Sequence, residues 1–219
     1  MTTILLTGFE PFAGAESNPS GQAVELVASR WNRPETLVTS ILPVEFDAAG
    51  AALATLVADH SPDVVLAAGL ADGRRSISIE RVAINVDDAR IPDNGGAQPI
   101  DRPIDPSGPA AWFATLPIKA ITAAVGREGI PVAVSQTAGT YVCNHVFYET
   151  MRLLAAVASQ GPESGGCPGR PPARGGFVHV PAADVVSVEQ SACALEIALA
   201  TTLAVGAGAD AVVSAGAEH

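Results

Sequence analysis

Cys143 is the residue of this chain best placed for nucleophilic chemistry. It lies between an apolar run, 131–135, that predicts a buried strand and a segment whose apolar spacing predicts a helix to about Ala158. A cysteine in the first turn of a helix is close to unpaired backbone N–H groups, which favour the thiolate. Free cysteines are also common in protein cores, so position alone leaves both a nucleophile and a packing residue open.

A cysteine nucleophile needs a base, and the chain has four histidines. His60 ends an exposed predicted helix and His219 is the last residue, so both are expected in solvent. His145 lies about 200° around the helix axis from Cys143 and faces elsewhere. His179 lies in the next predicted strand. It could be a satisfied core residue, but if that strand is parallel and adjacent to the one before Cys143, both residues share a sheet edge. His179 is therefore the predicted base.

Glu80 is the predicted third member of the group. The predicted strand Ser76–Val86 alternates, which places Glu80 on an otherwise apolar face with Val82 and Ile84. A carboxylate buried there requires a hydrogen-bonding or cationic partner. One candidate is the imidazole of the catalytic base, whose tautomer the carboxylate would set. The other is a structural ion pair with an arginine such as Arg75, Arg81 or Arg90.

Strand and helix patterns alternate along the chain. This alternation predicts a largely parallel sheet with helices on both faces. Asn18 followed by Pro19 predicts a helix start. The Gly-, Pro- and Arg-rich segment Ser159–Gly176 predicts a mobile surface loop that contains an incidental Cys167, whereas Cys193 is expected to pack in a helix. The predicted strands are 3–7, 37–42, 64–68, 76–86, 131–135 and 177–180, and the helices begin near 19, 47, 118 and 143, with a final long helix.

Composition limits the class of protein. A chain of 219 residues with 48% apolar and 16% charged residues predicts one globular domain over 1–219, with homo-oligomerisation plausible. The net charge of −11 opposes nucleic-acid binding. The apolar run 192–205 is too short for a bilayer span and predicts a packed helix. Three cysteines and no signal-peptide pattern predict a reducing, cytoplasmic location.

Motifs for bound cofactors are absent from the sequence. It contains no H-E-x-x-H, no C-x-x-C and no Walker loop. The acidic residues from Asp87 to Asn94 do not have the spacing of a calcium loop, and the run Pro-Asp-Asn-Gly predicts a turn. We therefore expect neither a metal ion nor another cofactor.

Four segments resemble the pyrrolidone-carboxylate peptidase family, the bacterial type of pyroglutamyl peptidase I. The likeness covers nearly the whole chain and is carried by Leu6–Gly14 with Asn18-Pro19, by Glu80–Asn94, by Ser135–His145 and by Gly175–Pro181. The resemblance implies a single-domain, three-layer α/β/α sandwich with a mixed, mostly parallel twisted sheet. It also implies a cytoplasmic enzyme without a cofactor that frequently forms a tetramer.

The resemblance implies roles for particular residues. Cys143 would be the nucleophile, His179 its base and Glu80 the group that orients His179, as the topology also suggests. The aromatic residues Phe9, Phe12 and Tyr141 would sandwich the pyroglutamyl ring. The remaining substrate-binding candidates are Asn18 and the backbone of Val142 at the lactam and nearby carbonyl, Arg90 near the catalytic centre, and Leu70, where some members carry a glutamine.

These residues predict a cysteine peptidase that removes N-terminal pyroglutamate from peptides through a thioester. Tyr141 replaces a phenylalanine common in the family, so its hydroxyl must find a partner. One alternative is a non-catalytic member that binds pyroglutamyl peptides, although such a protein would be expected to lose one of Glu80, Cys143 or His179. A nucleoside phosphorylase, which has a related sheet architecture, is opposed by the lack of a phosphate-binding loop.

Overall fold

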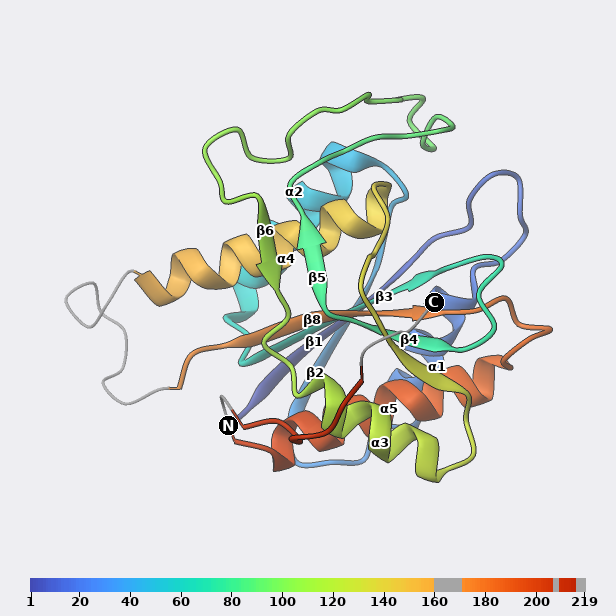
Figure 1. The fold of residues 1–219 in the computed structure, drawn as a ribbon, viewed down its shortest axis with the longest axis vertical. Coiled ribbons are helices and arrows are strands. Elements are labelled where there is room, and N and C mark those ends of the chain that lie inside the picture. The colour runs from blue at the N-terminus through green and yellow to red at the C-terminus, as the bar shows by residue number, and fades with distance from the viewer. Residues whose placement is uncertain (160–170, 207–208, 216–219) are drawn as a thin grey trace.

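A twisted sheet of six strands forms the centre of the protein in a computed structural model that describes residues 1–159, 171–206 and 209–215 (Figure 1). The strand order is β2-β1-β3-β8-β4-β7. Four neighbouring strands run parallel, whereas β4 pairs antiparallel with β8 and parallel with β7. The predicted mixed, mostly parallel sheet is confirmed. Its strands are β1 (Thr3–Phe9), β2 (Thr36–Leu42), β3 (Val64–Leu70), β4 (Ile77–Glu80), β7 (Val132–Ser135) and β8 (Arg174–Val180).

Helices cover both faces of this sheet (Figure 1). One face carries α1 (Pro19–Arg30), α3 (Ile118–Arg127) and α5 (Val188–Ala204), and the other carries α2 (Phe46–His60) and α4 (Val142–Ser159). Strand side chains alternate between the two layers: Ile4 and Leu6 join one core, whereas Leu5 joins the other. Burial on both faces explains why the strands are nearly continuous apolar runs. The predicted three-layer α/β/α architecture is confirmed.

The predicted strand Ser76–Val86 is wrong as a single element. The backbone N–H of Arg81 still donates to Ser135 in β7, but its carbonyl accepts from Ala114 outside the sheet. The chain therefore changes partner at Arg81, and the alternation that placed Val82 on one face with Glu80 ends there. The next three residues form β5 (Val82–Ile84), which pairs antiparallel with an unpredicted strand, β6 (Ala111–Phe113).

The expected adjacency of the strands on either side of Cys143 is also wrong. β4 lies between β7 and β8, so β7 and β8 run antiparallel and their carboxyl ends point to opposite edges. The prediction assumed the usual parallel crossover, but the antiparallel insertion of β4 breaks it. Any meeting of Cys143 and His179 must therefore come from other elements.

Part of the predicted loop Ser159–Gly176 is a strand. Arg174, Gly175 and Gly176 pair with β3, and the Arg174 N–H donates to the Asp63 carbonyl at 2.9 Å. Composition suggested a loop because two glycines are unusual in a strand interior, but here leucine side chains fill the space above them. Residues 160–170, including Cys167, lie outside the described residues.

The start of α1 is packed directly against the end of β1. Asn18 caps the helix, since its Oδ1 accepts from the Ser20 N–H at 3.0 Å, which confirms the predicted helix start. A Cβ at Gly21 would lie 2.6 Å from the Phe9 carbonyl oxygen, and one at Gly8 would lie 2.8 Å from the Ser20 carbonyl oxygen. Only glycine at these two positions permits the close approach of α1 to the end of β1. This approach determines the path of the loop between Phe9 and Asn18.

Gly21→Ala is predicted to lower the free energy of unfolding by about 1–3 kcal/mol, because the added methyl would overlap backbone that cannot move aside. Gly126→Ala is the matched control in α3, where the nearest atom to the new Cβ would be a Val132 methyl at 3.7 Å. Alanine should stabilise that site by about 0.5–1 kcal/mol. Urea unfolding at one protein concentration would compare the two. Equal shifts in the midpoint would contradict the packing argument.

Candidate active site

Cys143 lies in the first turn of α4, beside the carboxyl ends of β3 and β8. A Cβ at Gly69 in β3 would lie 2.7 Å from the Cys143 Sγ and 2.8 Å from the Phe177 Cζ. Gly69 is in register with His179 on the neighbouring strand. The structure thus brings Cys143 and His179 to the same sheet edge, as expected, but β3 and β8 form that edge. The absence of a side chain at Gly69 makes room for the sulfur.

Glu80 and His179 are in direct contact. The His179 Nδ1 lies 2.7 Å from the Glu80 Oε1, and the carboxylate is fully buried. Both face the same side of the sheet as Cys143, although they come from antiparallel strands. Because Nδ1 is engaged by the carboxylate, Nε2 is the ring nitrogen left to exchange a proton.

The sequence left open whether Glu80 serves a histidine or an arginine, and the structure shows both at once. Arg74 donates from Nη1 to the Glu80 Oε1 at 2.5 Å. It is not one of the three arginines considered from sequence: the Arg81 Nε donates to Gln136, and Arg75 and Arg90 are exposed. Arg74 comes shortly after β3, at the carboxyl edge of the sheet. This position is the sequence signal that could have identified it as a partner of Glu80.

The thiol and the imidazole are both in environments that favour their neutral forms. Burial and the Glu80 carboxylate raise the pKa of Cys143 to about 12, although Arg74 acts in the opposite direction. Burial lowers the pKa of His179, against the effect of Glu80. The pKa of the Cys143 thiol is therefore raised by burial, although a position in the first turn of a helix favours the thiolate.

The predicted aromatic residues lie at different depths. Phe12 and Tyr141 are in contact, with ring centroids 5.4 Å apart. The Tyr141 hydroxyl donates to the Pro92 carbonyl at 3.0 Å, which is the partner that its replacement of phenylalanine required. Phe9 is only 2% exposed and packs in the core. Phe46, which sequence reasoning missed, meets the Tyr141 ring edge-on at 5.3 Å.

Three of the other predicted substrate residues, Asn18, Leu70 and Val142, lie at or next to the ends of elements that meet at this edge. Asn18 is buried, and its side chain accepts from Ser20 and donates to the Glu10 carbonyl, so it shapes the loop that carries Phe12. Leu70 ends β3 half-buried, and Val142 is buried directly before Cys143. Arg90 is exposed.

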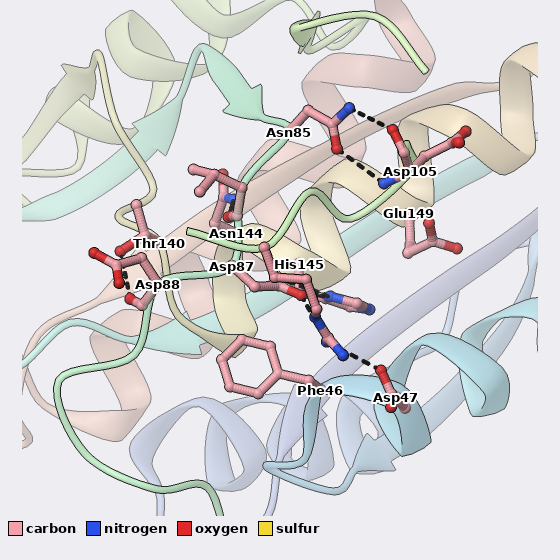
Figure 2. A network of polar contacts seen from close by, with 12 residues as sticks. Phe46, Asp47, Asn85, Asp87, Asp88, Asp105, Thr140, Asn144, His145 and Glu149 are labelled. Atoms are coloured by element: carbon pink, nitrogen blue, oxygen red, sulfur yellow. Dashed lines mark hydrogen bonds and ion pairs between the residues drawn. The ribbon is translucent and has the colours of Figure 1, made fainter. Parts of the chain in front are cut away.

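The residues next to Cys143 fasten the start of α4 to the chain after β5 (Figure 2). The Asn144 side chain donates to the Ile84 and Val86 carbonyls and accepts from the Ile84 N–H, at 2.8 to 3.0 Å. The His145 Nδ1 lies 3.0 Å from the buried Asp87 carboxylate, which also accepts from Arg102. His145 thus faces away from Cys143, as predicted, and this second histidine–carboxylate pair is part of the anchor.

Within the described ranges, no group of three or more His, Cys, Asp or Glu side chains is arranged to hold a metal ion. None of the helices in this part of the chain combines the length and the apolar character needed to cross a bilayer.

Fold and site together define a class: three-layer α/β proteins that bring a cysteine, a histidine and a buried carboxylate together at one edge of the sheet. A model of the pyroglutamyl peptidase family matches residues 2–215. The pyrrolidone-carboxylate peptidase of Clavibacter michiganensis is 54% identical over 83% of this chain and 79% of its own, and that of Escherichia fergusonii is 44% identical over both full lengths. The chain belongs to the pyroglutamyl peptidase family.

Solved structures agree with this. The crystal structure of Bacillus amyloliquefaciens pyroglutamyl peptidase I superimposes with a TM-score of 0.82 at 39% identity, covering 93% of this chain and 98% of that one. The Thermococcus litoralis pyrrolidone carboxyl peptidase gives a TM-score of 0.82 at 34% identity, covering 93% and 94%. The expected family and α/β fold are confirmed.

Alkylation of Cys143 by iodoacetamide is predicted to accelerate about tenfold per pH unit through pH 7 to 10, because the pKa of the thiol is raised to about 12. Peptide mass spectrometry would separate Cys143 from Cys167 and Cys193. N-acetylcysteine is the control, and its rate should level off above about pH 9. A rate for Cys143 that is already flat at neutral pH would reveal a resting thiolate and contradict this assignment.

Proposed function

We propose that this protein hydrolyses the bond after an N-terminal pyroglutamyl residue, with Cys143 as nucleophile, His179 as base and Glu80 as the group that orients His179. The contact of 2.7 Å between the Glu80 Oε1 and the His179 Nδ1, at the edge where Cys143 lies, is the observation that carries the proposal. Membership of the pyroglutamyl peptidase family supplies the substrate class.

The first half of the reaction forms a thioester. The His179 Nε2 takes the thiol proton as the Cys143 Sγ attacks the pyroglutamyl carbonyl carbon. The carbonyl π electrons move to its oxygen, and backbone N–H groups near Val142 and Cys143, with Arg90, stabilise that oxyanion. When the oxyanion re-forms the carbonyl, the C–N bond breaks and the imidazolium gives its proton to the departing amine.

The second half hydrolyses the thioester. The neutral His179 Nε2 takes a proton from water, whose oxygen attacks the thioester carbonyl, and the thiolate leaves and recovers the proton. Free pyroglutamate departs. The resting pair is neutral, so proton transfer accompanies attack, and Glu80 stabilises the imidazolium only while it exists.

The proposed specificity for pyroglutamate is explained by the lactam ring of the substrate, which carries no charge. The Phe12 and Tyr141 side chains offer an aromatic wall that a lactam can pack against, whereas a free amino terminus would have to shed its hydration. Phe9 supports this wall from the core. Asn18 and the Val142 backbone are proposed to address the lactam and its carbonyl, and the Leu70 side chain contributes packing.

A fluorogenic pyroglutamyl amide is predicted to be turned over under reducing conditions, with prolyl and alanyl amides slower by about 10⁴-fold, because they leave lactam-binding groups unpaired. Cys143→Ala should lower kcat by on the order of 10⁴-fold or more, and Cys193→Ser is the matched control that should leave it unchanged. A folded wild type that binds the amide without turnover would instead support the non-catalytic alternative, although the compared relatives are named as peptidases.

We also propose a homo-oligomer, a tetramer or a dimer, in the cytoplasm. Its support is the exposure of large apolar side chains, including Phe113 at 65% and Ile100 at 76%. A reducing location would keep the Cys143 thiol available. Light scattering after gel filtration should give a mass of two or four chains at micromolar concentration, with Phe113→Asp as a test of that surface. A monomer at high concentration would refute the assembly.

A further inference from the structure

Two residues from separate parts of the chain support Glu80. Its Oε1 receives both the Arg74 Nη1 at 2.5 Å and the His179 Nδ1 at 2.7 Å. Its Oε2 is buried and has no hydrogen-bond partner among the described residues. The carboxylate therefore depends on two partners, and loss of Arg74 would leave it with His179 alone. An uncompensated buried carboxylate is strongly unfavourable.

Arg74 reaches beyond Glu80. Its Nη2 donates to the Thr137 carbonyl at 2.8 Å, in the loop that leads from β7 to Cys143. The turn that carries Arg74 is itself fixed: the Arg74 N–H donates to the Ala71 carbonyl at 3.2 Å, and the Ala71 N–H donates to Val180, the residue after His179, at 2.9 Å. The Arg74 guanidinium thus joins Glu80 to the approach to Cys143, and the backbone of its turn is bound to the end of β8.

We propose that Arg74 is a positioning residue, which holds the Glu80 carboxylate on the His179 Nδ1 and ties it to the loop that places Cys143. The proposal rests on the mechanism proposed above. With the guanidinium on Oε1, the same oxygen accepts the hydrogen of Nδ1, so Nε2 is free to accept the thiol proton. If the carboxyl group were protonated, it would donate to Nδ1, and the proton would sit on Nε2, the wrong tautomer for a base.

A cation that only compensates for a buried charge would behave differently. Such a cation would affect folding and, through its charge, the titration of His179, but it would not need to hold Glu80 and Thr137 in one geometry. Burial first, and then Arg74, lower the pKa of His179 against the effect of Glu80, and Arg74 also lowers that of Cys143. In addition to Glu80, Arg74 and His179, Tyr141 is a titratable side chain close to Cys143. Removal of the guanidinium should therefore move the titration of His179 to higher pH.

The test compares Arg74→Gln, Arg74→Lys and the control Arg75→Gln, which changes the exposed neighbour. Arg74→Gln should lower kcat by about 10²-fold with little change in KM, because base and nucleophile lose their alignment. The acidic limb of its kcat/KM profile, and the His179 ring titration followed by NMR without substrate, should move up by about one pH unit. Arg75→Gln should match the wild type in all three measurements.

Arg74→Lys separates charge from geometry. A single ammonium keeps a positive charge at Glu80 but cannot hold Glu80 and Thr137 as a planar guanidinium does. It should restore the wild-type titration midpoint, yet leave kcat about tenfold low. This variant also decides the question if Arg74→Gln does not fold, as judged by circular dichroism, because a wild-type kcat in Arg74→Lys would exclude the positioning role.

Two outcomes overturn the proposal. One is an Arg74→Gln enzyme whose kcat stays within about threefold of the wild type. The other is a loss of activity without any movement of the His179 midpoint, which would show that Arg74 does not act on the Glu80–His179 pair. If the wild type does not hydrolyse the pyroglutamyl amide, the proposed function fails, but the substrate-free NMR titration still shows whether Arg74 acts on the Glu80–His179 pair.

Discussion

The burial of the Glu80 carboxylate is the constraint on which the rest of the site depends. A fully buried negative charge requires compensating partners, and here Arg74 and His179 supply them, both at Oε1. Both partners must reach one oxygen, so the end of β8 and the turn after β3 have to lie close to the end of β4. The antiparallel insertion of β4 achieves this, because it brings Glu80 to the His179 face of the sheet although the two residues are 99 positions apart.

Glycines in the strands let neighbouring side chains pack closely on both faces of the sheet. A Cβ at Gly175 would lie 2.6 Å from Leu154 of α4, and one at Gly176 would lie 2.6 Å from Leu116 on the other face. These close contacts pack both layers against β8 and fix the position of the strand that carries His179. Gly69 makes room for the Cys143 sulfur in the same way. The interior packs so closely that backbone without side chains becomes part of the site.

The start of α4 is held by hydrogen bonds that do not involve the proposed chemistry. Asn144 and His145 bind the chain after β5, and Tyr141 binds Pro92, so the residues on both sides of Cys143 are fastened to one segment (Figure 2). This arrangement suits a nucleophile that rests as a neutral thiol. A pre-formed thiolate would be held in place by attraction to a positive charge. A neutral thiol instead needs its base already in position, and the rigid anchoring of α4 provides this.

Much of this protein could be predicted from its sequence, because local patterns report local structure. Apolar periodicity predicted the strands of the main sheet and the starts of α1 to α4 to within a few residues. The exception is β4, which leaves the sheet at Arg81. The family motifs supported the choice of Cys143, His179 and Glu80. Only the tertiary structure decided which strands are neighbours, which arginine meets Glu80 and how burial sets the charge of Cys143. Strand pairing and desolvation depend on contacts between distant residues, and no local pattern contains them.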